Sequence, residues 1–368
     1  MKYTSLLLLF LVMFSCKKEK DTKVEETSFF TDDTRHFQMG FTTWPYAPTL
    51  QAVNDTYRFI GANADVYEEM FSQKVPWQAW INNTTLPQAY TDEVYRYVNR
   101  RISGKKLMLS VSILNIFRDD LAPDYDGSTP AYTSFSDAAI EEAYYKHLSY
   151  LIQTIQPDYL IYGMEINELY VHNRSQWESL KLLMNRIRQR IKTAYPDLPL
   201  SESFTLHALY QSGLSDAADY EQEVFEHVNQ DDFVSVSFYP FFKKWTTRQE
   251  WQQALDFLHA HVQKPIVFSE TGHISADLQI QAYNFSINGS ETEQNEFLQT
   301  LLLNAQQHSY EFVIWWTHRD YYQTWLTFPP ETQDLGRFWL TTGLLKDDGR
   351  YREAYDSWKE VYQKNYLP

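Results

Sequence analysis

Short apolar runs alternate with longer amphipathic segments along most of the chain. Several of these runs place hydrophobic residues in succession, as the strands of a parallel sheet do when both of its faces are buried. Eight runs predict strands, which lie at residues 37–42, 65–70, 106–113, 159–164, 198–204, 233–239, 265–270 and 312–316.

The segments between the predicted strands are typical of helices, because their apolar residues recur at three- and four-residue spacing. Ser175 is predicted to cap a helix that ends before Pro196, where proline stops it. Ser136 is predicted to begin a second helix. A third helix, through Phe297 and Leu301, precedes the last strand.

Strands that alternate with helices in this way predict an α/β fold, a (β/α)8 TIM barrel. An open, doubly wound parallel sheet is the alternative. No glycine-rich phosphate-binding loop follows the first predicted strand, and this disfavours the alternative. The sequence has no internal repeat and no boundary of a second domain. We therefore expect residues 35–368 to form one catalytic domain.

The first residues indicate an export signal. Positive charge at Lys2 precedes an unbroken apolar run at residues 6–14, which is too short to span a bilayer stably. The run is followed by Cys16, the only cysteine of the chain, and then by a charged stretch. This order resembles a bacterial lipoprotein signal, although Met13 and Phe14 stand where that signal usually has leucine and a small residue.

The resemblance implies that residues 1–15 are a signal peptide and that Cys16 carries the lipid that anchors the protein to a bacterial membrane. Residues 16–34 are charged, lack apolar periodicity and predict a flexible tether. An ordinary cleaved signal is the second interpretation. Under either interpretation the protein is exported, and a lipid would hold it at the cell surface or facing the periplasm.

Composition narrows the choice of partners. The formal net charge of −16 would repel a nucleic acid backbone or an anionic membrane face, so a neutral ligand is easier to accommodate. Aromatic residues make up 17% of the chain, with 11 Trp and 27 Tyr, which suits either stacking on flat sugar rings or the packing of a large barrel. No motif implies a metal or cofactor, and no Gly-x-Ser-x-Gly of a serine hydrolase is present. The sequence leaves the oligomeric state open.

Two carboxylates close predicted strands at the end where (β/α)8 barrels carry their active sites. Glu165 follows the fourth predicted strand, and Glu270 ends the seventh. These strands face each other across the barrel mouth, so the two groups can flank a glycosidic bond. A gap of about 5 Å would leave room for a nucleophile and an acid but for no water between them, which implies retention of configuration. Tyr239, at the end of the sixth strand, can hydrogen-bond Glu270.

Together these motifs resemble clan A of the glycoside hydrolases, and they are most similar to family 53, the endo-β-1,4-galactanases. In that family strand 6 ends in Tyr-Tyr-Pro and strand 7 in Glu-Thr, and residues 232–240 (DFVSVSFYP) and 265–272 (PIVFSETG) fit both patterns. The closing stretch at 342–345 (TGLL) is also similar. The resemblance implies that Glu165 is the acid/base and Glu270 the nucleophile.

The fourth strand departs from the family pattern, which reads Gly-Asn-Glu. Aligned on Gly163, the acid/base is Glu165, and Met164 replaces the asparagine that holds the sugar's 2-hydroxyl in the clan. Asn167 could partly substitute for it. Alternatively, Asn167 and Glu168 form the Asn-Glu pair of a longer strand, and Glu168 is the acid/base. The expected strand length favours Glu165.

Aromatic and polar residues near other strand ends are candidates for substrate contact. Three tryptophans could stack on sugars or pack in the wall, namely Trp44, Trp315 and Trp316. His207 could contact substrate or be structural, and Glu68 and Glu69 could line the groove or pair with a nearby arginine. The sequence thus predicts a retaining glycoside hydrolase acting on a β-linked poly- or oligosaccharide. The rival interpretation, favoured by Met164, is a glycan-binding surface lipoprotein that kept the barrel and lost the chemistry.

Overall fold

The computed structural model describes residues 28–128 and 134–368, and chain contacts separate a short N-terminal piece from a compact body over Asp32–Pro368. The predicted signal peptide, Cys16 and most of the predicted tether lie outside the described residues. None of the helices in the described ranges has the length and apolar character that a membrane span needs.

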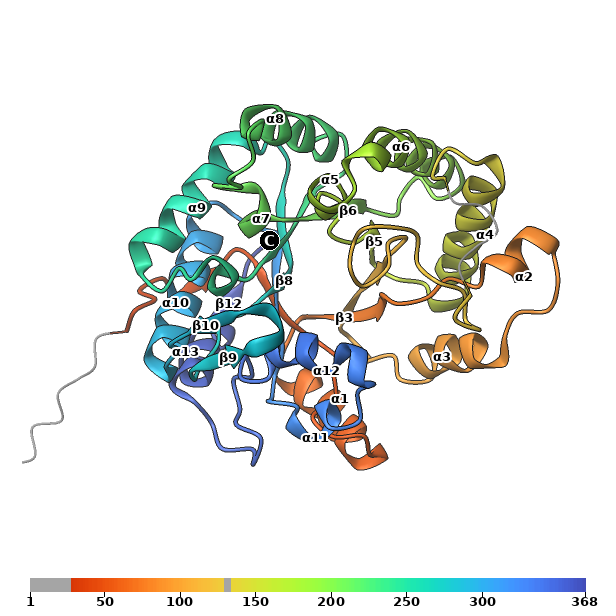
Figure 1. Ribbon diagram of the computed structural model, residues 1–368. Coiled ribbons are helices and arrows are strands. Elements are labelled where there is room, and N and C mark those ends of the chain that lie inside the picture. The colour runs from red at the N-terminus through yellow and green to blue at the C-terminus, as the bar shows by residue number, and fades with distance from the viewer. Residues whose placement is uncertain (1–27, 129–133) are drawn as a thin grey trace, which may run out of the picture. The chain divides into compact units, whose positions relative to one another are not determined.

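Eight parallel strands close into a barrel in the order β11-β2-β3-β4-β5-β6-β7-β8 (Figure 1). The strands are β2 Gln38–Thr42, β3 Val66–Phe71, β4 Lys106–Val111, β5 Tyr159–Gly163, β6 Leu200–Thr205, β7 Val234–Phe238, β8 Ile266–Thr271 and β11 Phe312–Trp315. Each overlaps one of the eight predicted runs. The prediction of a single-domain (β/α)8 barrel is therefore confirmed, and the open sheet is excluded because β11 pairs with both β2 and β8.

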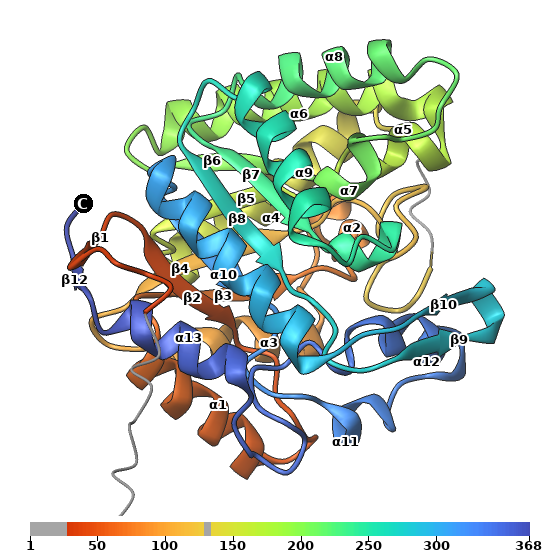
Figure 2. The same cartoon turned by 90° about the vertical axis from the view of Figure 1, so that its left-hand side faces the viewer.

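Helices connect successive strands and cover the outside of the barrel (Figures 1 and 2). The main helices are α1 Leu50–Asn63, α3 Gln88–Val98, α4 Ala138–Ile155, α6 Trp177–Ala194, α8 Ala217–Val228, α9 Arg248–His261, α10 Glu291–Gln307 and α13 Glu353–Tyr362. Shorter helices lie in the loops, namely α2 Trp77–Asn82, α5 Glu168–His172, α7 Leu206–Leu209, α11 Tyr322–Trp325 and α12 Pro330–Gly336.

Two predicted helix starts were wrong by one residue. Ser136 does not cap α4, because the Asp137 side chain accepts the hydrogen bond from the first turn of that helix. Ser175 lies inside a short 3₁₀ helix, and its hydroxyl donates to Asn173 rather than capping α6. The third prediction is confirmed, since α10 begins after Ser290, whose hydroxyl accepts from the backbone of Glu293.

Apolar side chains from alternating strand positions fill the barrel interior. The buried cluster consists of Val66, Met108, Ile161, Met164, Phe233, Val267, Phe312 and Ile314. Gly40 on β2 makes this close packing possible, because a Cβ at that position would lie 2.3 Å from the Val66 carbonyl oxygen. The interior of the barrel is therefore packed with apolar side chains.

Additional elements lie at the two ends of the barrel (Figure 2). The hairpin of β9 Leu278–Ile280 and β10 Phe285–Ile287, together with α11 and α12, borders the mouth at the carboxyl ends of the strands. At the opposite end, β1 Thr34–Arg35 pairs in parallel with β12 Asn365–Tyr366. Elements that follow different strands thus border the mouth. The two ends of the body meet at the opposite end of the barrel, its floor.

Candidate active site

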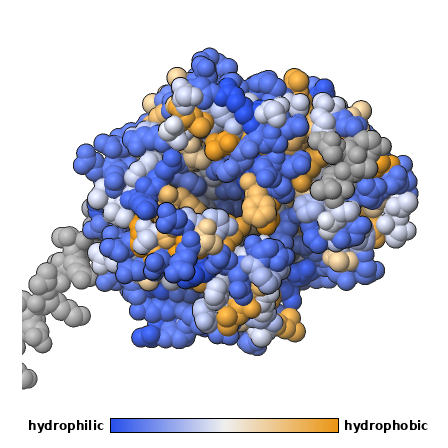
Figure 3. Space-filling view, in the orientation of Figure 1, coloured by the Kyte–Doolittle hydropathy of each residue, from blue (hydrophilic) through white to orange (hydrophobic). Residues whose placement is uncertain are grey.

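The barrel mouth forms a hollow near the middle of the face seen in Figure 3, with hydrophilic surface and apolar patches around it. Glu165 enters this region directly after β5, in the left-handed backbone conformation with φ of 51°. Its backbone N–H donates to the Ser203 hydroxyl at 2.8 Å, which fixes the turn. A residue other than glycine in this conformation is strained, and such strain is often found at functional sites.

The Glu165 carboxylate is held by two partners. One oxygen accepts from Nε and Nη2 of Arg118 at 3.0 and 2.8 Å, and the other accepts from the Ser237 hydroxyl on β7 at 2.7 Å. Arg118 is itself fixed, because its Nη1 donates to the Ser112 hydroxyl and to the Asn115 carbonyl in the loop after β4. Glu165 therefore lies in the mouth as the charged partner of an ion pair.

Glu270 lies at the end of β8 and shares this region. The Tyr239 hydroxyl donates to its Oε2 at 3.1 Å, as expected from the position of Tyr239 after β7. Burial and the nearby charge of Glu165 raise the pKa of Glu270 to about 8, while Arg118 and the Tyr239 hydrogen bond act in the opposite direction. The two predicted catalytic carboxylates are thus close enough to influence each other's charge.

Glu68 adds a third carboxylate to the group from the inner face of β3. It is fully buried, and one of its oxygens accepts from the Ser110 hydroxyl at 2.6 Å, whereas the other has no hydrogen-bond partner. Burial and the neighbouring Glu270 hold its pKa well above the usual range. Glu68 therefore resists ionisation, and its partner is the Ser110 hydroxyl rather than an arginine.

Glu168, the alternative acid/base, is turned away from Glu270. Its carboxylate accepts from the Thr205 hydroxyl at 2.5 Å and lies 3.3 Å from Nε2 of His172. Burial alone would raise the pKa of Glu168, but the hydrogen bond from His172 and the nearby His207 and Thr205 outweigh it and lower the pKa. A group held ionised in this way is poorly suited to donate a proton.

Asn167 and His207, which were predicted to contact substrate, are buried and bonded to other parts of the protein. Asn167 is fully buried, and its amide bridges the backbone and hydroxyl of Thr205 and the hydroxyl of Tyr220, so no polar atom is left for a sugar. His207 is buried, stacks on Phe242 and accepts from the backbone N–H of Tyr239 at 3.3 Å. Both side chains therefore support the wall of the site.

Met164 also points away from the opening. It belongs to the buried apolar cluster inside the barrel and is 3% exposed. The position that carries asparagine in clan A is therefore filled by core packing, and Asn167 does not substitute for it.

The tryptophans at the strand ends separate into two groups. Trp315 is fully buried and donates through Nε1 to the Thr342 carbonyl, so the prediction that it stacks on a sugar was wrong. Trp44 and Trp316 are half-buried, and their rings lie 5.2 Å apart at the rim of the mouth. Trp339 is also half-buried, with its ring 5.8 Å from that of Tyr239. These three rings offer the apolar surfaces on which a sugar could stack.

The sequence did not identify every side chain of the site. Arg118 lies in a loop rich in charged residues, and nothing in its neighbourhood marks it as different from a solvated arginine. Ser237 could have been found, because it precedes Tyr239 by two residues and so faces the barrel interior from the same strand. Trp339 follows α12, far in sequence from any strand end.

Among the residues that the structure describes, no group of three or more His, Cys, Asp or Glu side chains could hold a metal ion. The side chains that the structure brings together here are carboxylates, a tyrosine, an arginine and aromatic rings.

Comparisons with known proteins agree with this architecture. No family model matches the sequence, and no curated protein matches it either. Among solved structures, a GH5_18 protein from Bifidobacterium longum subsp. infantis has a TM-score of 0.65 at 15% identity, covering 91% of this chain and 80% of that one. The GH53 catalytic domain of Ignisphaera aggregans has a TM-score of 0.55 at 13% identity, covering 84% and 88%.

A β-glucuronidase from an uncultured Clostridium sp. has a TM-score of 0.55 at 12% identity over 89% of this chain. This chain spans half the length of that protein. The chain therefore has the barrel fold of glycoside hydrolases that include families GH5 and GH53.

Proposed function

We propose that this chain is a retaining glycoside hydrolase that cleaves a β-linked poly- or oligosaccharide. The observation that carries the proposal is the convergence of Glu165 and Glu270 from strands on different sides of the mouth, each with a hydrogen-bond donor on its carboxylate. The names of the neighbours agree with a β-linked substrate, since one is an exo-β-1,4-mannosidase and another was crystallised with Manb1-4GlcNAc.

In the first step Glu270 attacks the anomeric carbon while the bond to the leaving oxygen breaks. Glu165 gives its proton to that oxygen, so the leaving sugar departs as a neutral alcohol. The product is a glycosyl ester on Glu270. The Tyr239 hydroxyl orients the Glu270 carboxylate for this attack, because it fixes one of the two oxygens.

In the second step Glu165, now a carboxylate, takes a proton from water as the water attacks the anomeric carbon. The ester bond breaks, Glu270 regains its charge, and the sugar leaves with its original configuration. Two inversions at one carbon give net retention.

These roles require one proton on Glu165 and none on Glu270, but the surroundings of Glu270 in the free protein favour its protonated form. Arg118 pairs with Glu165, and the pKa of Glu270 is raised to about 8. Two coupled carboxylates can exchange a shared proton. We propose that the sugar displaces Arg118 from Glu165, so that the proton moves to Glu165 and leaves Glu270 charged.

One observation favours a second function, a glycan-binding protein without catalysis. The bidentate contact of Arg118 occupies the oxygen of Glu165 that an acid would use, and Met164 is drawn into the core. If the ion pair persists when a sugar binds, no proton is available for the leaving group. The same aromatic rim would then serve recognition alone.

The test is hydrolysis of a panel of aryl β-glycosides and β-linked polysaccharides by residues 34–368, with Glu165→Gln, Glu270→Gln and Glu168→Gln beside the native sequence. Loss of activity in the first two variants, with activity kept in Glu168→Gln, supports the assignment. Proton NMR of the first product formed then distinguishes retention from inversion. Loss in Glu168→Gln but not in Glu165→Gln would transfer the acid/base role. Glycan binding without hydrolysis by the native protein would establish the second function.

We also propose that Cys16 carries a lipid that anchors the protein to a bacterial membrane. The support is the apolar run and the charged stretch on either side of this cysteine. Labelling of growing cells with an alkyne fatty acid should mark the native protein but not a Cys16→Ser variant. Equal labelling of both, or labelling of neither, would contradict the proposal.

A further inference from the structure

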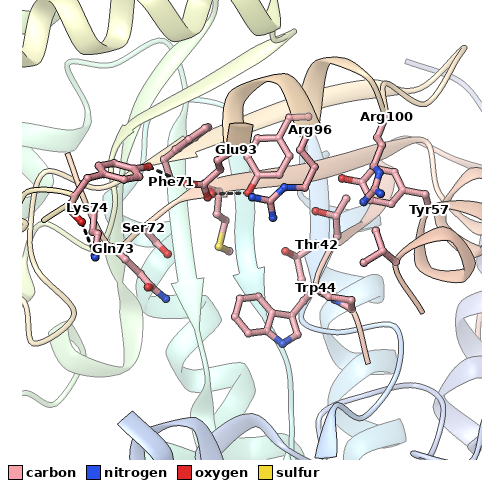
Figure 4. A pocket seen from close by; sticks show the side chains of 16 residues that line it. Thr42, Trp44, Tyr57, Phe71, Ser72, Gln73, Lys74, Glu93, Arg96 and Arg100 are labelled. Atoms are coloured by element: carbon pink, nitrogen blue, oxygen red, sulfur yellow. Dashed lines mark hydrogen bonds between the residues drawn. The ribbon is translucent and has the colours of Figure 1, made fainter. Parts of the chain in front are cut away.

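A second hollow lies beside the mouth, between the carboxyl ends of β2 and β3 and the helix α3 (Figure 4). Its volume is about 260 Å³. Three cationic side chains, Lys74, Arg96 and Arg100, line it together with one carboxylate, Glu93. The hollow therefore has a local excess of positive charge, although the net charge of the whole chain is −16.

The cations of this hollow are not held by ion pairs, although Lys74 Nζ donates to the Tyr125 carbonyl at 3.2 Å. No ion pair within residues 28–128 and 134–368 involves Lys74, Arg96 or Arg100, whereas Arg101 and Arg118 each have a carboxylate at 2.6 and 2.8 Å. Arg96 and Arg100 lie instead over tyrosine rings, 5.9 and 5.6 Å from their centroids. Their guanidinium donors are therefore available to a ligand.

The carboxylates nearby offset this charge only in part. Glu93 accepts from the Tyr125 hydroxyl, and burial raises its pKa. Glu69 is buried nearby, where it accepts from Thr43 and Tyr57. Burial raises its pKa to about 7, while the charges of Arg96 and Arg100 act in the opposite direction. Near neutral pH part of the Glu69 population is uncharged, so the hollow keeps a net positive charge.

The hollow adjoins the mouth at Trp44. Trp44 lines the hollow and also packs against Trp316 at the rim of the mouth. Met70 lines it too, from the strand that carries Glu68, a neighbour of Glu270. A sugar chain that occupies the mouth and crosses the Trp44 ring therefore reaches the arginines.

We propose that this hollow binds an anionic group, a carboxylate or a sulfate ester, on a sugar ring of the glycan held in the mouth. The proposal rests on the proposed function and names the class of substrate, an acidic β-linked glycan. Guanidinium groups suit both anions because they can donate two parallel hydrogen bonds. The volume lies just below the range of about 300–1,000 Å³ typical of drug-sized ligands, which suits a single sugar ring. The chain as a whole is acidic, which favours a neutral ligand, but the local charge of this hollow is positive and favours an anion.

The experiment compares matched tetrasaccharides on a background that cannot turn over, the Glu270→Gln variant. Gluco-, galacto- and manno-configured β-1,4 tetrasaccharides are each used in neutral, C6-oxidised and 6-sulfated form, and their dissociation constants are measured by calorimetry. We expect an acidic form to bind at least about tenfold more tightly than its neutral counterpart, about 1.4 kcal/mol. The oxidised and sulfated arms show which anion is preferred. The preference should weaken as sodium chloride rises from about 50 to about 500 mM.

A second pair of variants tests the residues. Arg96→Gln with Arg100→Gln should remove the preference for the acidic form and leave binding of the neutral form within about twofold, because neutral sugars make no contact that needs the positive charge. Arg58→Gln is the matched control, since Arg58 is an exposed helical arginine on α1 paired with Asp55. It should change neither affinity.

Equal affinity for acidic and neutral forms on all three backbones would overturn the proposal, as would a preference that survives the double variant. Hydrolysis of the same sugars by the native protein separates this inference from the proposed function. Cleavage without a preference for acidic sugars would support the proposed hydrolase and contradict the proposed anion site. Arginine-dependent binding of the acidic form without any cleavage supports the anion site and contradicts the enzyme.

Discussion

Replacement of Glu270 by glutamine should stabilise the fold, and it should do so more at high pH than at low pH. The carboxyl of Glu270 has an ordinary pKa of 4.5 and a pKa of about 8 in the folded protein. The folded state therefore keeps a proton that the unfolded chain releases. The stability associated with this proton is complete below about pH 4.5 and is lost as the pH rises through about 8. Glutamine is neutral at every pH and lacks this dependence.

The magnitude follows from the size of the shift. A difference of about 3.5 pKa units corresponds to about 5 kcal/mol at roughly 1.4 kcal/mol per unit. Glu270 is half-buried, and its charge interacts with the neighbouring carboxylates Glu165 and Glu68, so we expect roughly half of this value, about 2–3 kcal/mol. The variant and the native protein should be almost equally stable near pH 4.5, and the variant should be more stable above pH 8.

Urea unfolding of both proteins between about pH 4.5 and about pH 8.5 measures this difference. Glu226→Gln, on the exposed face of α8, is the control and should show no such trend. A difference that stays constant across the pH range would refute the reasoning, because it would mean that Glu270 does not hold a proton in the folded state. A variant less stable at every pH would refute it as well.

Four further substitutions test other contacts. Tyr239→Phe removes the donor to Glu270 and should lower kcat about 10- to 100-fold, measured on the best substrate, without changing the melting temperature much. Asn167→Ala should cost about 2–4 kcal/mol in urea unfolding, because it leaves buried backbone and hydroxyl groups of the wall unpaired. Gly40→Ala should cost more than about 2 kcal/mol in the same assay, since its Cβ would overlap a carbonyl oxygen. Arg352→Leu should cost about 3–5 kcal/mol, because it leaves the buried Asp320 carboxylate without its partner. Unchanged kcat in Tyr239→Phe, or unchanged stability in any of the other three variants, would contradict the role assigned to that contact.

The barrel could be predicted because its strands are buried on both faces. Continuous apolar runs such as that of β8 are rare outside parallel sheets, and all eight runs proved to be strands. Helix starts were less certain, because Ser136 and Asp137 are both good caps and only the local backbone decides between them. Neighbouring polar residues cannot be distinguished by pattern alone.

The candidate site was predictable where strand position alone determines which side chains meet. Glu165, Glu270 and Tyr239 all stand at the carboxyl ends of barrel strands, and the structure brings them together. Arg118 was not predictable, because it reaches Glu165 from a loop whose shape depends on its own hydrogen bonds. Trp315 was misassigned because side chains alternate along a strand, so one of two successive tryptophans must face the helices.

The pairing of β1 with β12 has a consequence for how the molecule can be attached to anything else. Both ends of the body leave from the floor of the barrel, on the side opposite the hairpin and helices that border the mouth (Figure 2). A chain held through residues before Thr34, by a lipid on Cys16 as we propose or by a fusion partner, would therefore be joined behind the barrel. The point of attachment would then lie at the far end of the barrel from the mouth, so immobilisation through either end of the body should leave substrate access intact.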